Sequence, residues 1–450
     1  MKIDIPKQAG VIVRTLIAHG YEAYVVGGCV RDSILGRTPS DWDITTSARP
    51  EQVKALFPKT IDTGIRHGTV TVMMDKTGYE VTTYRIDGIY EDHRRPRDVT
   101  FTASLREDLM RRDFTINAMA YNDTDGLVDL FGGMEDLRTK TVRCVGEAED
   151  RFEEDALRML RAVRFAAQLH FRIAPDTRAA IAARHKNLQA VSAERIQMEL
   201  LKLLISDHPE LLREAYATGL TGVFLPEFDR MMETPQNNPH HRYSVGEHTI
   251  HAMCAVEPNP VLRLTMLLHD IGKPATRTTD ACGIDHFYNH YKVSADMSRE
   301  ILRRLKFDNK TIQLVCQLIA HHDIRFRHPK TTGRRHVRKV MHSVGPTLFP
   351  YLLQVMEADV RAQSDYYQAE KLSILEETRE TYQEILDAAD CLTLKDLKIN
   401  GNQLKALGIR EGKIIGAILN TLLSMVLEHP ELNEYVYLKE LALKIYRELR

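Results

Sequence analysis

The spacing of apolar residues changes near Glu149, and this change limits the possible folds more than any other feature of the chain. Upstream, short β-rich runs at 21–28, 68–74 and 79–85 alternate with turn residues, and residues 50–57 have the pattern of a helix. Downstream, apolar residues recur every three or four positions almost to the C-terminus. We therefore predict an α+β fold, in which a small mixed-sheet head is followed by an elongated and mostly α-helical neck, body and tail.

A stretch rich in Pro, Asn and His interrupts the helical pattern at 233–244 and is predicted to be a linker. At roughly 100–200 residues per domain, the length allows about two to four domains. The predicted segments are a head at 1–140, a helical neck and body at 141–232, a second helical domain at 240–365 and a helical tail at 366–450.

The composition is typical of a globular protein, with 43% hydrophobic and 27% charged residues. No stretch approaches the roughly 20 apolar residues of a membrane span, so no membrane partner is expected. Six cysteines without a CxxC pair predict reduced thiols and a cytoplasmic location. The charges of the 61 Lys and Arg residues nearly cancel those of the 62 Asp and Glu residues. Between positions 85 and 172, however, 14 of the 15 basic residues are Arg, which suits bidentate phosphate and base contacts. The neutral total therefore does not exclude a nucleic-acid partner.

Two short motifs lie within residues 27–43. Gly27 and Gly28 end an apolar run and open a predicted helix, where missing side chains let backbone N–H groups approach an anion. Arg31 lies one turn into that helix, placed to meet a phosphate. Asp41 and Asp43 are expected to point to one face of a strand. Two carboxylates on one face repel each other unless a divalent cation lies between them, and hard oxygen ligands suit Mg²⁺.

Together these motifs predict metal-assisted nucleotidyl transfer, with two Mg²⁺ ions about 3.5–4 Å apart. Each motif alone is weak, because two glycines can form an ordinary turn and two aspartates can lie on a surface. A third catalytic carboxylate is predicted at Glu80, which shares a strand face with Thr82 and Tyr84. An exposed charge on an edge strand explains Glu80 equally well.

Residues 153–164 suggest how a protein could select bases. On a single helix, the charged side chains of this segment fall within an arc of about 120°: Glu154, Asp155, Arg158 and Arg161. An ordinary solvated helix face with ion pairs also explains this pattern. Cytosine and adenine each present an amino donor beside a ring-nitrogen acceptor, which a carboxylate beside a guanidinium complements. Uracil and guanine would leave buried polar groups unpaired, at about 1–3 kcal/mol each. Asp155 and Arg158 are therefore predicted to select CTP and ATP without a nucleic-acid template.

Several motifs occur in an order and spacing that resemble one family: GGCVRD, LG and DWDITT within 27–46, RRDFTINAMA at 111–120 and RFEEDALRMLRAVRFA at 151–166. They resemble the class II tRNA nucleotidyltransferase (CCA-adding enzyme) and bacterial poly(A) polymerase family, strongly over 1–210 and more loosely beyond. The resemblance implies a polymerase β-like nucleotidyltransferase head that adds C, C and A from CTP and ATP to the 3′ end of tRNA and releases pyrophosphate.

The resemblance also implies roles for individual residues. Asp41 and Asp43 would hold Mg²⁺. The nucleotide-binding positions would be Gly28, Arg31, Arg112, Asp155, Arg158, Arg161 and Arg164. Asp113 is expected to cap or orient Arg112. The polar segment 90–101 resembles the family's flexible loop, which is linked to the final A addition, and the tail resembles the region that grips the tRNA acceptor arm.

Histidines are concentrated in the second half of the chain, with 12 of 19 within 240–342. Imidazole and carboxylate together form a ligand set for borderline metals. The pattern resembles the HD metal-dependent phosphohydrolase superfamily, with predicted ligands His248, His269, Asp270 and Asp359, and with His290 and His321 extending the series to a two-metal site. The resemblance implies a divalent transition metal, of unspecified identity, that activates water to hydrolyse phosphomonoesters or 2′,3′-cyclic phosphates at RNA ends.

A helical domain with structural His–Asp pairs is the alternative to this metal site. His251 is expected in the core or beside the ligands. The remaining histidines of the region are expected to be solvated: His240, His241, His328, His336 and His342.

Two further features suit RNA but have structural explanations. Glycines spaced through 401–416 can expose N–H groups to phosphate or shape a helix–turn–helix unit. The basic stretch 327–339 can bind RNA backbone or form a solvated turn.

The predicted function has three alternatives. A poly(A) polymerase, or a tRNA enzyme that adds only A, uses the same chemistry. A phosphohydrolase driven by the histidine site belongs to a different class, as does a non-catalytic RNA-binding protein.

Overall fold

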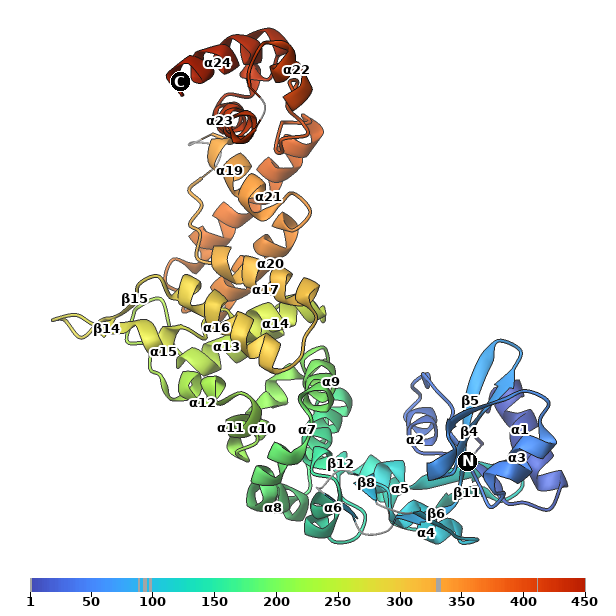
Figure 1. The fold of residues 1–450 in the computed structure, drawn as a ribbon. Coiled ribbons are helices and arrows are strands. Elements are labelled where there is room, and N and C mark those ends of the chain that lie inside the picture. The colour runs from blue at the N-terminus through green and yellow to red at the C-terminus, as the bar shows by residue number, and fades with distance from the viewer. Residues whose placement is uncertain are drawn as a thin grey trace. The chain divides into compact units, whose positions relative to one another are not determined.

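A seven-stranded sheet forms the centre of the head, in the order β11-β10-β1-β2-β5-β4-β3 (Figure 1). All neighbouring strands are antiparallel except β2 and β5, which are parallel. The strands are β1 (Ala23–Val26), β2 (Ile44–Thr46), β3 (Thr60–Gly64), β4 (Thr69–Met74), β5 (Thr77–Thr83), β10 (Met119–Asn122) and β11 (Gly126–Asp129). The β-rich runs at 21–28, 68–74 and 79–85 are thereby confirmed as strands.

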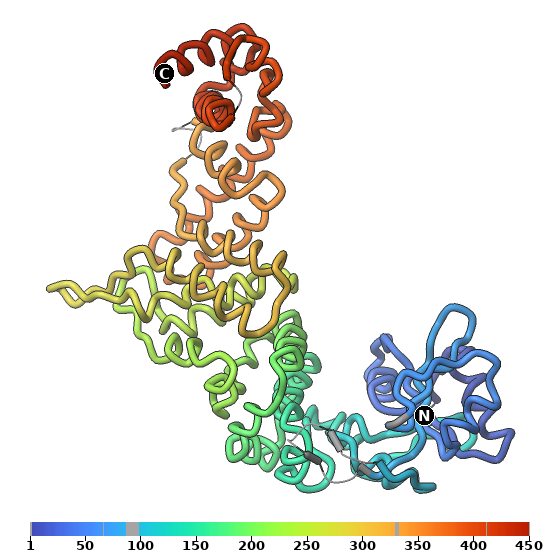
Figure 2. Tube along the Cα trace, in the orientation of Figure 1, coloured from blue at the N-terminus to red at the C-terminus, as the bar shows by residue number. Residues whose placement is uncertain are grey.

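The computed structural model describes residues 2–87, 90–91, 95–96, 99–328, 333–410 and 412–449, whose path is traced in Figure 2. The chain divides into two compact units, Met1–Pro226 and Glu227–Arg450. Within the described ranges, no helix combines the length and the apolar character that crossing a lipid bilayer requires.

Short helices complete the head. Helix α3 starts at Pro50, whose fixed φ suits the first helical position, and confirms the helix predicted over 50–57. Helices α1 and α3 pack against each other and against the sheet. The helices are α1 (Lys7–Ala18), α2 (Gly28–Ile34), α3 (Pro50–Leu56), α4 (Leu105–Met110) and α5 (Gly133–Arg138), with 3-10 turns η1 (Ile65–His67) and η2 (Thr115–Asn117). Four short strands lie outside the main sheet: β6 (Arg85–Asp87), β7 (Tyr90–Glu91), β8 (Arg95–Pro96) and β9 (Val99–Phe101).

The rest of the first unit is helical, as the change in periodicity predicts. Helix α9 packs on α7, and β12 (Thr141–Val142) pairs with β13 (Arg172–Ile173). The helices are α6 (Ala148–Glu154), α7 (Leu157–Leu169), α8 (Pro175–Arg184), α9 (Ala193–Leu204), α10 (Leu212–Ala217) and α11 (Thr221–Phe224), with 3-10 turns η3 (His185–Ala190) and η4 (Pro209–Leu211).

The second unit begins with helices whose ends carry clear capping signals. Ser244, Asn259 and Asp308 accept hydrogen bonds from the first backbone N–H groups of the helices that follow them. These elements are α12 (Pro226–Glu233), α13 (Val245–Cys254), α14 (Pro260–Leu268), α15 (Lys273–Thr276), α16 (His290–Arg304) and α17 (Asn309–His321), with a hairpin of β14 (Arg277–Thr279) and β15 (Asp285–Phe287).

One apolar core joins the remaining helices. Leu352 of α20 is fully buried in the same cluster as Leu422 and Leu438 near the C-terminus. The helices are α19 (Arg335–Val344), α20 (Phe349–Ala362), α21 (Gln368–Asp387), α22 (Gly401–Ala406), α23 (Lys413–Glu428) and α24 (Tyr435–Glu448), with the 3-10 turn η5 (Pro430–Leu432). Gly408 and Gly412 have φ of 83° and 128°, so turn geometry alone explains these two glycines.

The stretch 233–244 lies within the second unit and not at the division between the units, which falls between Pro226 and Glu227. It is held by buried Asp285, whose Oδ2 accepts a hydrogen bond from the Asn237 N–H at 2.9 Å, while the Asp285 N–H donates to the Asn237 carbonyl at 2.9 Å. The predicted linker is therefore an ordered part of this unit. The four proposed domain ranges remain predictions.

The basic stretch 327–339 pairs mainly with acidic residues. Its residues 329–332 lie outside the described part of the chain. Of the described residues, Arg334 pairs with Glu384 at 2.7 Å, Arg335 with Glu428 at 2.6 Å and Arg338 with Asp390 at 3.1 Å. These three arginines therefore contribute to packing of the second unit.

The contact between α12 and α13 depends on a missing side chain. A Cβ at Gly246 would lie 2.5 Å from Met232 Sδ and 2.7 Å from the Met232 backbone N and Cα, and backbone cannot yield easily. We expect Gly246→Ala to lower the free energy of unfolding by about 1–3 kcal/mol through overpacking. Urea unfolding followed by circular dichroism measures this change.

Gly416→Ala is the matched control, because Gly416 lies within α23 and a Cβ there would meet no atom within 4 Å beyond the backbone of its own helix. There the better helix propensity of alanine should stabilise the unit by up to about 1 kcal/mol. Equal effects of the two substitutions would contradict the packing argument.

Candidate functional site

The turn between β1 and α2 brings a glycine pair against an arginine. Gly27 has φ of 83°, and a Cβ there would lie 3.1 Å from Nη1 of Arg112. Arg112 Nη2 is 3.5 Å from Asp108 Oδ2, whereas its Nε is buried without a hydrogen-bond partner. The missing side chain of Gly27 thus lets a partly unpaired guanidinium lie against the turn that opens α2 at Gly28, an arrangement suited to an anion.

Asp41 and Asp43 precede β2 and do not lie on a strand, so the expected strand alternation does not align them. Their position is set by pairing, because the Val26 N–H donates to the Asp43 carbonyl at 3.0 Å and so joins the end of β1 to the segment before β2. Asp43 therefore lies beside the Gly27 turn.

Glu80 lies on β5, which is an inner strand between β2 and β4. The edge-strand alternative is therefore wrong. Ile44 pairs with Val81 in the parallel ladder, so Glu80 stands alongside Asp43, one position before this pair. The register brings all three predicted carboxylates to the same end of the central strands.

The surroundings of Asp43 raise its pKa to about 6. The largest cause is partial removal of the carboxyl from water by surrounding protein, although the residue keeps an exposed face. The Asp41 charge raises the pKa further and Arg112 lowers it, and Glu80 adds a smaller increase. Among the described residues, these carboxylates do not form a group of three with all ligand oxygens within 4.8 Å. They are nevertheless a set of hard oxygen donors whose mutual repulsion a divalent cation would relieve.

Arg31 is turned inward. Its Nη1 donates to Asn117 Oδ1 at 2.6 Å, its Nε and Nη2 donate to Asp32 at 2.9 Å, and its guanidinium lies 5.0 Å from the centre of the Phe165 ring. Arg31 ties α2 to η2 and α7 in this structure, so the expected placement at a phosphate is not observed.

The segment 153–164 is not one helix. Helix α6 ends at Glu154, Asp155 has extended φ of −138°, and α7 starts at Leu157. The 120° arc therefore does not apply to Glu154 and Asp155. The break is stabilised because Asp155 Oδ1 accepts a hydrogen bond from the Leu157 N–H at 3.1 Å.

Asp155 and Arg158 each have a partner that holds the side chain in place. Arg195 Nη2 donates to Asp155 Oδ2 at 2.7 Å. Arg158 is buried, pairs with Glu154, and donates from Nη2 to the Arg111 carbonyl at 2.9 Å. Asp155 and Arg158 lie close in the chain but do not form a side-chain pair with each other.

Arg161 and Arg164 form ion pairs with buried carboxylates. Arg161 donates from Nε and Nη2 to Asp113 Oδ2 at 2.9 and 2.6 Å, and Arg164 donates to Glu199. Burial opposes the charge of Asp113, but Arg161 outweighs it and holds the Asp113 pKa well below its usual range. The expectation that Asp113 orients Arg112 is wrong, since Asp108 is the carboxylate beside Arg112.

Sequence reasoning missed Arg195, Asp108 and Glu199. Glu199 carried a signal, because it lies on the apolar face of α9 between Ile196 and Leu203 and is only 4% exposed. A carboxylate on such a face requires a partner. Arg195 pairs with a residue 40 positions away, which local spacing does not reveal. The predicted loop 90–101 includes residues 92–94 and 97–98, which lie outside the described part of the chain.

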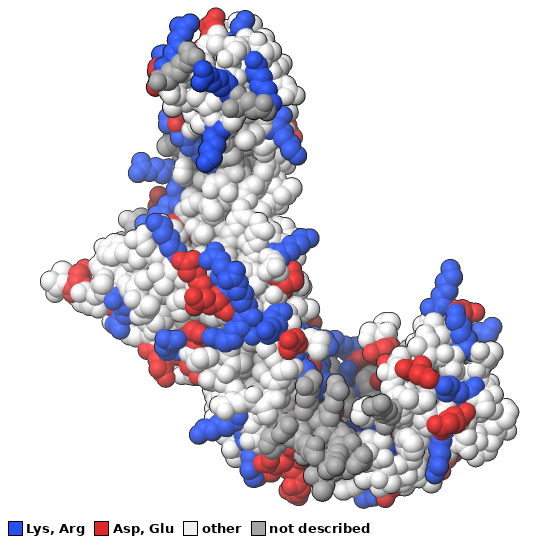
Figure 3. Space-filling view, viewed as in Figure 1, with Lys and Arg blue, Asp and Glu red and all other residues white. Residues whose placement is uncertain are grey.

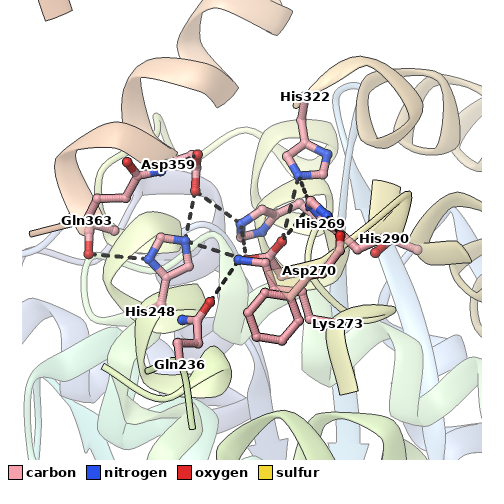
Figure 4. A network of polar contacts seen from close by, with 12 residues as sticks. Gln236, His248, His269, Asp270, Lys273, His290, His322, Asp359 and Gln363 are labelled. Atoms are coloured by element: carbon pink, nitrogen blue, oxygen red, sulfur yellow. Dashed lines mark hydrogen bonds and ion pairs between the residues drawn. The ribbon is translucent and has the colours of Figure 1, made fainter. Parts of the chain in front are cut away.

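The second candidate site is a buried cluster of imidazoles and carboxylates (Figure 4). Its first ligand group joins four residues from α13, the end of α14 and α20, with ligand atoms within 4.8 Å of one another: His248, His269, Asp270 and Asp359. His248 Nε2 is 2.8 Å from Asp359 Oδ1, and His269 Nε2 is 3.2 Å from Asp270 Oδ2. All four predicted first-group ligands are thus brought together.

A second ligand group shares Asp270 and adds His290 and His322. Their Nε2 atoms are 3.2 Å apart, and each lies within 3.7 Å of Asp270 Oδ1. The prediction of His290 fits this group, but the prediction of His321 is wrong. His321 Nε2 instead lies 2.8 Å from Ser343 Oγ.

Backbone carbonyls orient the imidazoles of the cluster. Nδ1 of His269, His290 and His322 lies 2.7–2.8 Å from the carbonyl three residues earlier. Because Nδ1 then carries the proton in a neutral ring, each Nε2 presents a lone pair toward the carboxylates. With all three rings neutral, as metal binding requires, their Nε2 atoms would be acceptors. His269 Nε2 makes no hydrogen bond of good geometry with a neighbour.

Lys273 supplies positive charge to the cluster. Its buried Nζ lies 2.7 Å from Asp270 Oδ2 and donates to Gln236 Oε1 at 2.9 Å. Burial lowers the pKa of His269, but Asp270 and Asp359 outweigh burial and raise it to about 10. Burial likewise opposes the charges of Asp270 and Asp359, whose cationic neighbours hold both pKa values well below the usual range. These three shifts have the sign expected where a cation is favoured, whereas burial lowers the pKa of His290.

Other histidines of the region depart from expectation. His241 is not solvated, since its ring lies 5.2 Å from that of His248 and burial lowers its pKa to about 2. His251 is neither core nor beside the ligands, because it is exposed and stacked 4.3 Å from the Tyr243 ring. His336 and His342 are exposed as expected, while His240 and His328 are half-buried against Lys371 and Glu377.

Family models match three parts of this chain. The poly A polymerase head domain matches residues 23–143, the probable RNA and SrmB-binding site of polymerase A matches residues 170–232, and a putative tRNA nucleotidyltransferase domain 2 matches residues 283–442. The last match includes His290 and Asp359 as well as the tail.

Curated relatives are similar over about half of this chain. A CCA-adding enzyme of Geobacillus thermodenitrificans is 55% identical over 221 residues, which is 49% of this chain and 54% of the relative. A CCA-adding enzyme of Levilactobacillus brevis is 51% identical over 218 residues, which is 48% of this chain and 55% of the relative. These matches span about half the length of the curated relatives.

A solved structure extends the similarity along the whole chain. The crystal structure of Bacillus stearothermophilus CCA-adding enzyme in complex with CTP matches with a TM-score of 0.73 and 32% identity, covering 98% of each chain. This chain therefore belongs to the family of class II CCA-adding enzymes and bacterial poly(A) polymerases.

Proposed function

We propose that this chain is a tRNA nucleotidyltransferase that adds C, C and A from CTP and ATP to the 3′ end of tRNA without a nucleic-acid template. The observation that carries the proposal is the meeting of Asp41, Asp43 and Glu80 with the Gly27 turn at one end of the central strands. Membership of a family whose relatives are named CCA-adding enzymes supports it.

The three carboxylates fit Mg²⁺. The donor set is all oxygen. Burial raises the pKa of Asp43 most, and the charges of Asp41 and Glu80 add a repulsion that a divalent cation would remove. Bound Mg²⁺ would lower the pKa of the tRNA 3′-hydroxyl and screen the charge of the triphosphate. Beside it, the unpaired Nε of Arg112 and the backbone at Gly28 are suited to hold phosphate oxygens. Arg31 would join them only by releasing Asn117 or Asp32.

Asp155 and Arg158 are suited to read the base because their partners fix them in advance. Arg195 keeps the Asp155 carboxylate in place, yet each oxygen has a second lone pair that can accept the amino group of cytosine or adenine. Arg158 is held by Glu154 and the Arg111 carbonyl and offers the matching donor. Arg161 and Arg164 stabilise α7, which carries Arg158, through their ion pairs with Asp113 and Glu199.

The tRNA acceptor arm is the proposed macromolecular partner. Basic side chains gather over the C-terminal helices in the space-filling view (Figure 3). Exposed residues of this region include Lys398, Lys405, Arg410 and Lys413. Such charges neutralise backbone phosphates and make binding sensitive to salt.

We also infer a metal-dependent phosphohydrolase site in the second unit. The specific observation is that imidazole Nε2 atoms and carboxylate oxygens converge in a buried cluster. This nitrogen and oxygen set suits a divalent transition metal, and the sharing of Asp270 by both groups suits two ions. A metal there would activate water for attack on a phosphate ester. Lys273 is positioned to neutralise the ester oxygens.

The charges around Asp43 predict how much its pKa falls when each neighbouring carboxylate is removed. In metal-free protein, Asp41→Asn should lower the Asp43 pKa from about 6 toward the ordinary Asp value, and Glu80→Gln should lower it less, because each removes a like charge. Carbon-13 NMR of the full chain with labelled Asp side chains measures the titration. The control is Glu51→Gln, at an exposed position of α3. An unchanged pKa in Asp41→Asn would contradict the proposed carboxylate group.

The added sequence tests the activity itself. Incubated with the four NTPs, the wild type should add C, C and A to a tRNA that ends at its discriminator base, whereas a long A ladder would identify a poly(A) polymerase. Addition of A alone to a tRNA ending in CC would identify the A-adding enzyme.

Asp41→Ala tests the role of the carboxylates in this reaction. Incorporation should fall by at least about 100-fold, because loss of even an outer-shell partner of a metal lowers metal affinity or activity by about 10–100-fold. Asp62→Ala, at an exposed site on β3, should keep wild-type incorporation. Equal activity of the two variants would refute the assignment of Asp41.

The histidine cluster predicts a matched difference between neighbouring residues. His322→Ala should remove transition metal from the second group, while His321→Ala should not, because His321 faces Ser343. His269→Ala should weaken binding at the first group by at least about tenfold. Metal content after dialysis, measured by inductively coupled plasma mass spectrometry, gives the stoichiometry. Wild-type protein without transition metal would contradict the inferred site.

A further inference from the structure

Three aromatic rings lie together near the histidine cluster. The rings of His240 and Tyr366 are 4.9 Å apart at 60°, and those of Tyr366 and Tyr367 are 4.5 Å apart at 73°. Tyr366 and Tyr367 are 48% and 56% exposed, which is unusual for large rings in contact with each other. We call these three residues the Tyr366 platform.

A chain of polar contacts connects the Tyr366 platform to the proposed metal ligands. Gln363 Nε2 donates to Asp359 Oδ2 at 2.9 Å, and Gln363 Oε1 accepts from Lys371 Nζ at 2.6 Å. Lys371 Nζ also lies 3.2 Å from His240 Nδ1. Two side chains, Gln363 and Lys371, therefore separate the His240 ring from a carboxylate of the cluster. Gln363 and Asp359 are seen together in Figure 4.

The segment that carries the tyrosines is fixed at both ends. Residues 364–367 link α20, which supplies Asp359, to α21, which supplies Lys371. The Ser364 N–H donates to the His240 carbonyl at 2.9 Å. Tyr367 has φ of 55°, a left-handed conformation that is strained for a non-glycine residue. The chain thus holds exposed rings at a strained position beside a polar cluster.

Positive charge accompanies the rings. Lys371 touches His240, and Arg325 lies near enough for its charge to act on both Lys371 and His240. Lys273 lies within the cluster itself. A ligand with one planar apolar part and one anionic part would match rings on one side and cations with metal ligands on the other.

We propose that the Tyr366 platform binds a nucleobase, so that the ligand of the histidine cluster is a base-bearing phosphate ester, either a free nucleotide or the 3′ end of an RNA. This rests on the metal site inferred above, since the cluster would hold the phosphate. The base stacks on the tyrosines, and Lys371 faces the ester from the α21 side. Stacking accepts every base, because each has a π-face.

The β14–β15 hairpin offers a rival surface. Tyr288 is 69% exposed, stacks 5.5 Å from the His286 ring and precedes His290 by two residues. Its ring and that of His286 are nearly parallel at 8°. The polar contacts that lead from the Tyr366 platform to Asp359 do not pass through this hairpin. Substitution of Tyr288 therefore distinguishes binding at the hairpin from binding at the Tyr366 platform.

Surface plasmon resonance on immobilised full-length protein loaded with Ni²⁺ tests the proposal, since flowing ligand is replaced if it is hydrolysed. Two small probes differ only in the base-bearing part: adenosine 3′-monophosphate and glycerol 2-phosphate. Binding that disappears in His269→Ala is assigned to the cluster, which separates it from nucleotide binding by the head. A short RNA with a 3′-phosphate, compared with the free nucleotide, identifies the source of the ester.

Tyr366→Ala should weaken cluster-dependent binding of adenosine 3′-monophosphate about tenfold, and Tyr366→Phe, which keeps the ring, should stay within about twofold. Glycerol 2-phosphate should bind all these variants equally. Tyr437→Ala, an exposed tyrosine of α24, is the neutral control.

If metal is bound but Tyr366→Ala and wild type have equal affinity for the nucleotide, the platform is overturned and the metal site stands. Loss of affinity in Tyr288→Ala alone would overturn it in favour of the hairpin. Absence of transition metal from the wild type would overturn both the metal site and the platform.

Discussion

The cost of burying a charge without a partner is the constraint on which both sites depend. Buried Asp113 pairs with half-buried Arg161, and Glu199 and Arg164 are buried as a pair. Helices α7 and α9 and the head are thus joined by groups that would otherwise oppose folding. Buried polar atoms without a hydrogen bond of good geometry include the Nε of Arg112 and the Nε2 of His269, one at each proposed site.

The same constraint explains why the two sites are built differently. In the head, acidic groups of like charge gather at the ends of paired strands. The partial exposure of Asp43 and the charge of Arg112 reduce the cost of their repulsion. In the second unit the cluster is buried, so carbonyls direct the imidazole protons outward and Lys273 enters to offset Asp270. An open carboxylate site suits exchange of a nucleotide with its ion, whereas a buried mixed site suits a retained ion.

Much of the head could be predicted because its motifs are local. The glycine turn, helix α3 and the strands follow from spacing and turn residues, and strand order then brings Glu80 beside Asp43. The spacing of apolar residues did not predict where α6 ends. The pattern continues through Asp155, where a hydrogen bond from the Leu157 N–H to the Asp155 side chain stabilises the break. The cluster shows a missed signal: Val315, Ile319 and His322 recur at helical spacing on the buried face of α17, so periodicity favoured His322 over His321. The ordered stretch 233–244 could not be predicted, because its partner Asp285 is 48 residues from Asn237.

The two proposed recognition modes follow from what each site must discriminate. Asp155 and Arg158 are held by partners in fixed positions, and hydrogen bonds to a base edge distinguish cytosine and adenine from uracil and guanine. Exposed rings such as Tyr366 and Tyr367 distinguish a base from no base but not one base from another. A chain that selects bases while extending an RNA needs the first mode at its head. A site that acts on phosphate esters at RNA ends of any sequence needs only stacking. Exposed tyrosines provide stacking without buried polar groups that would each need a hydrogen-bond partner.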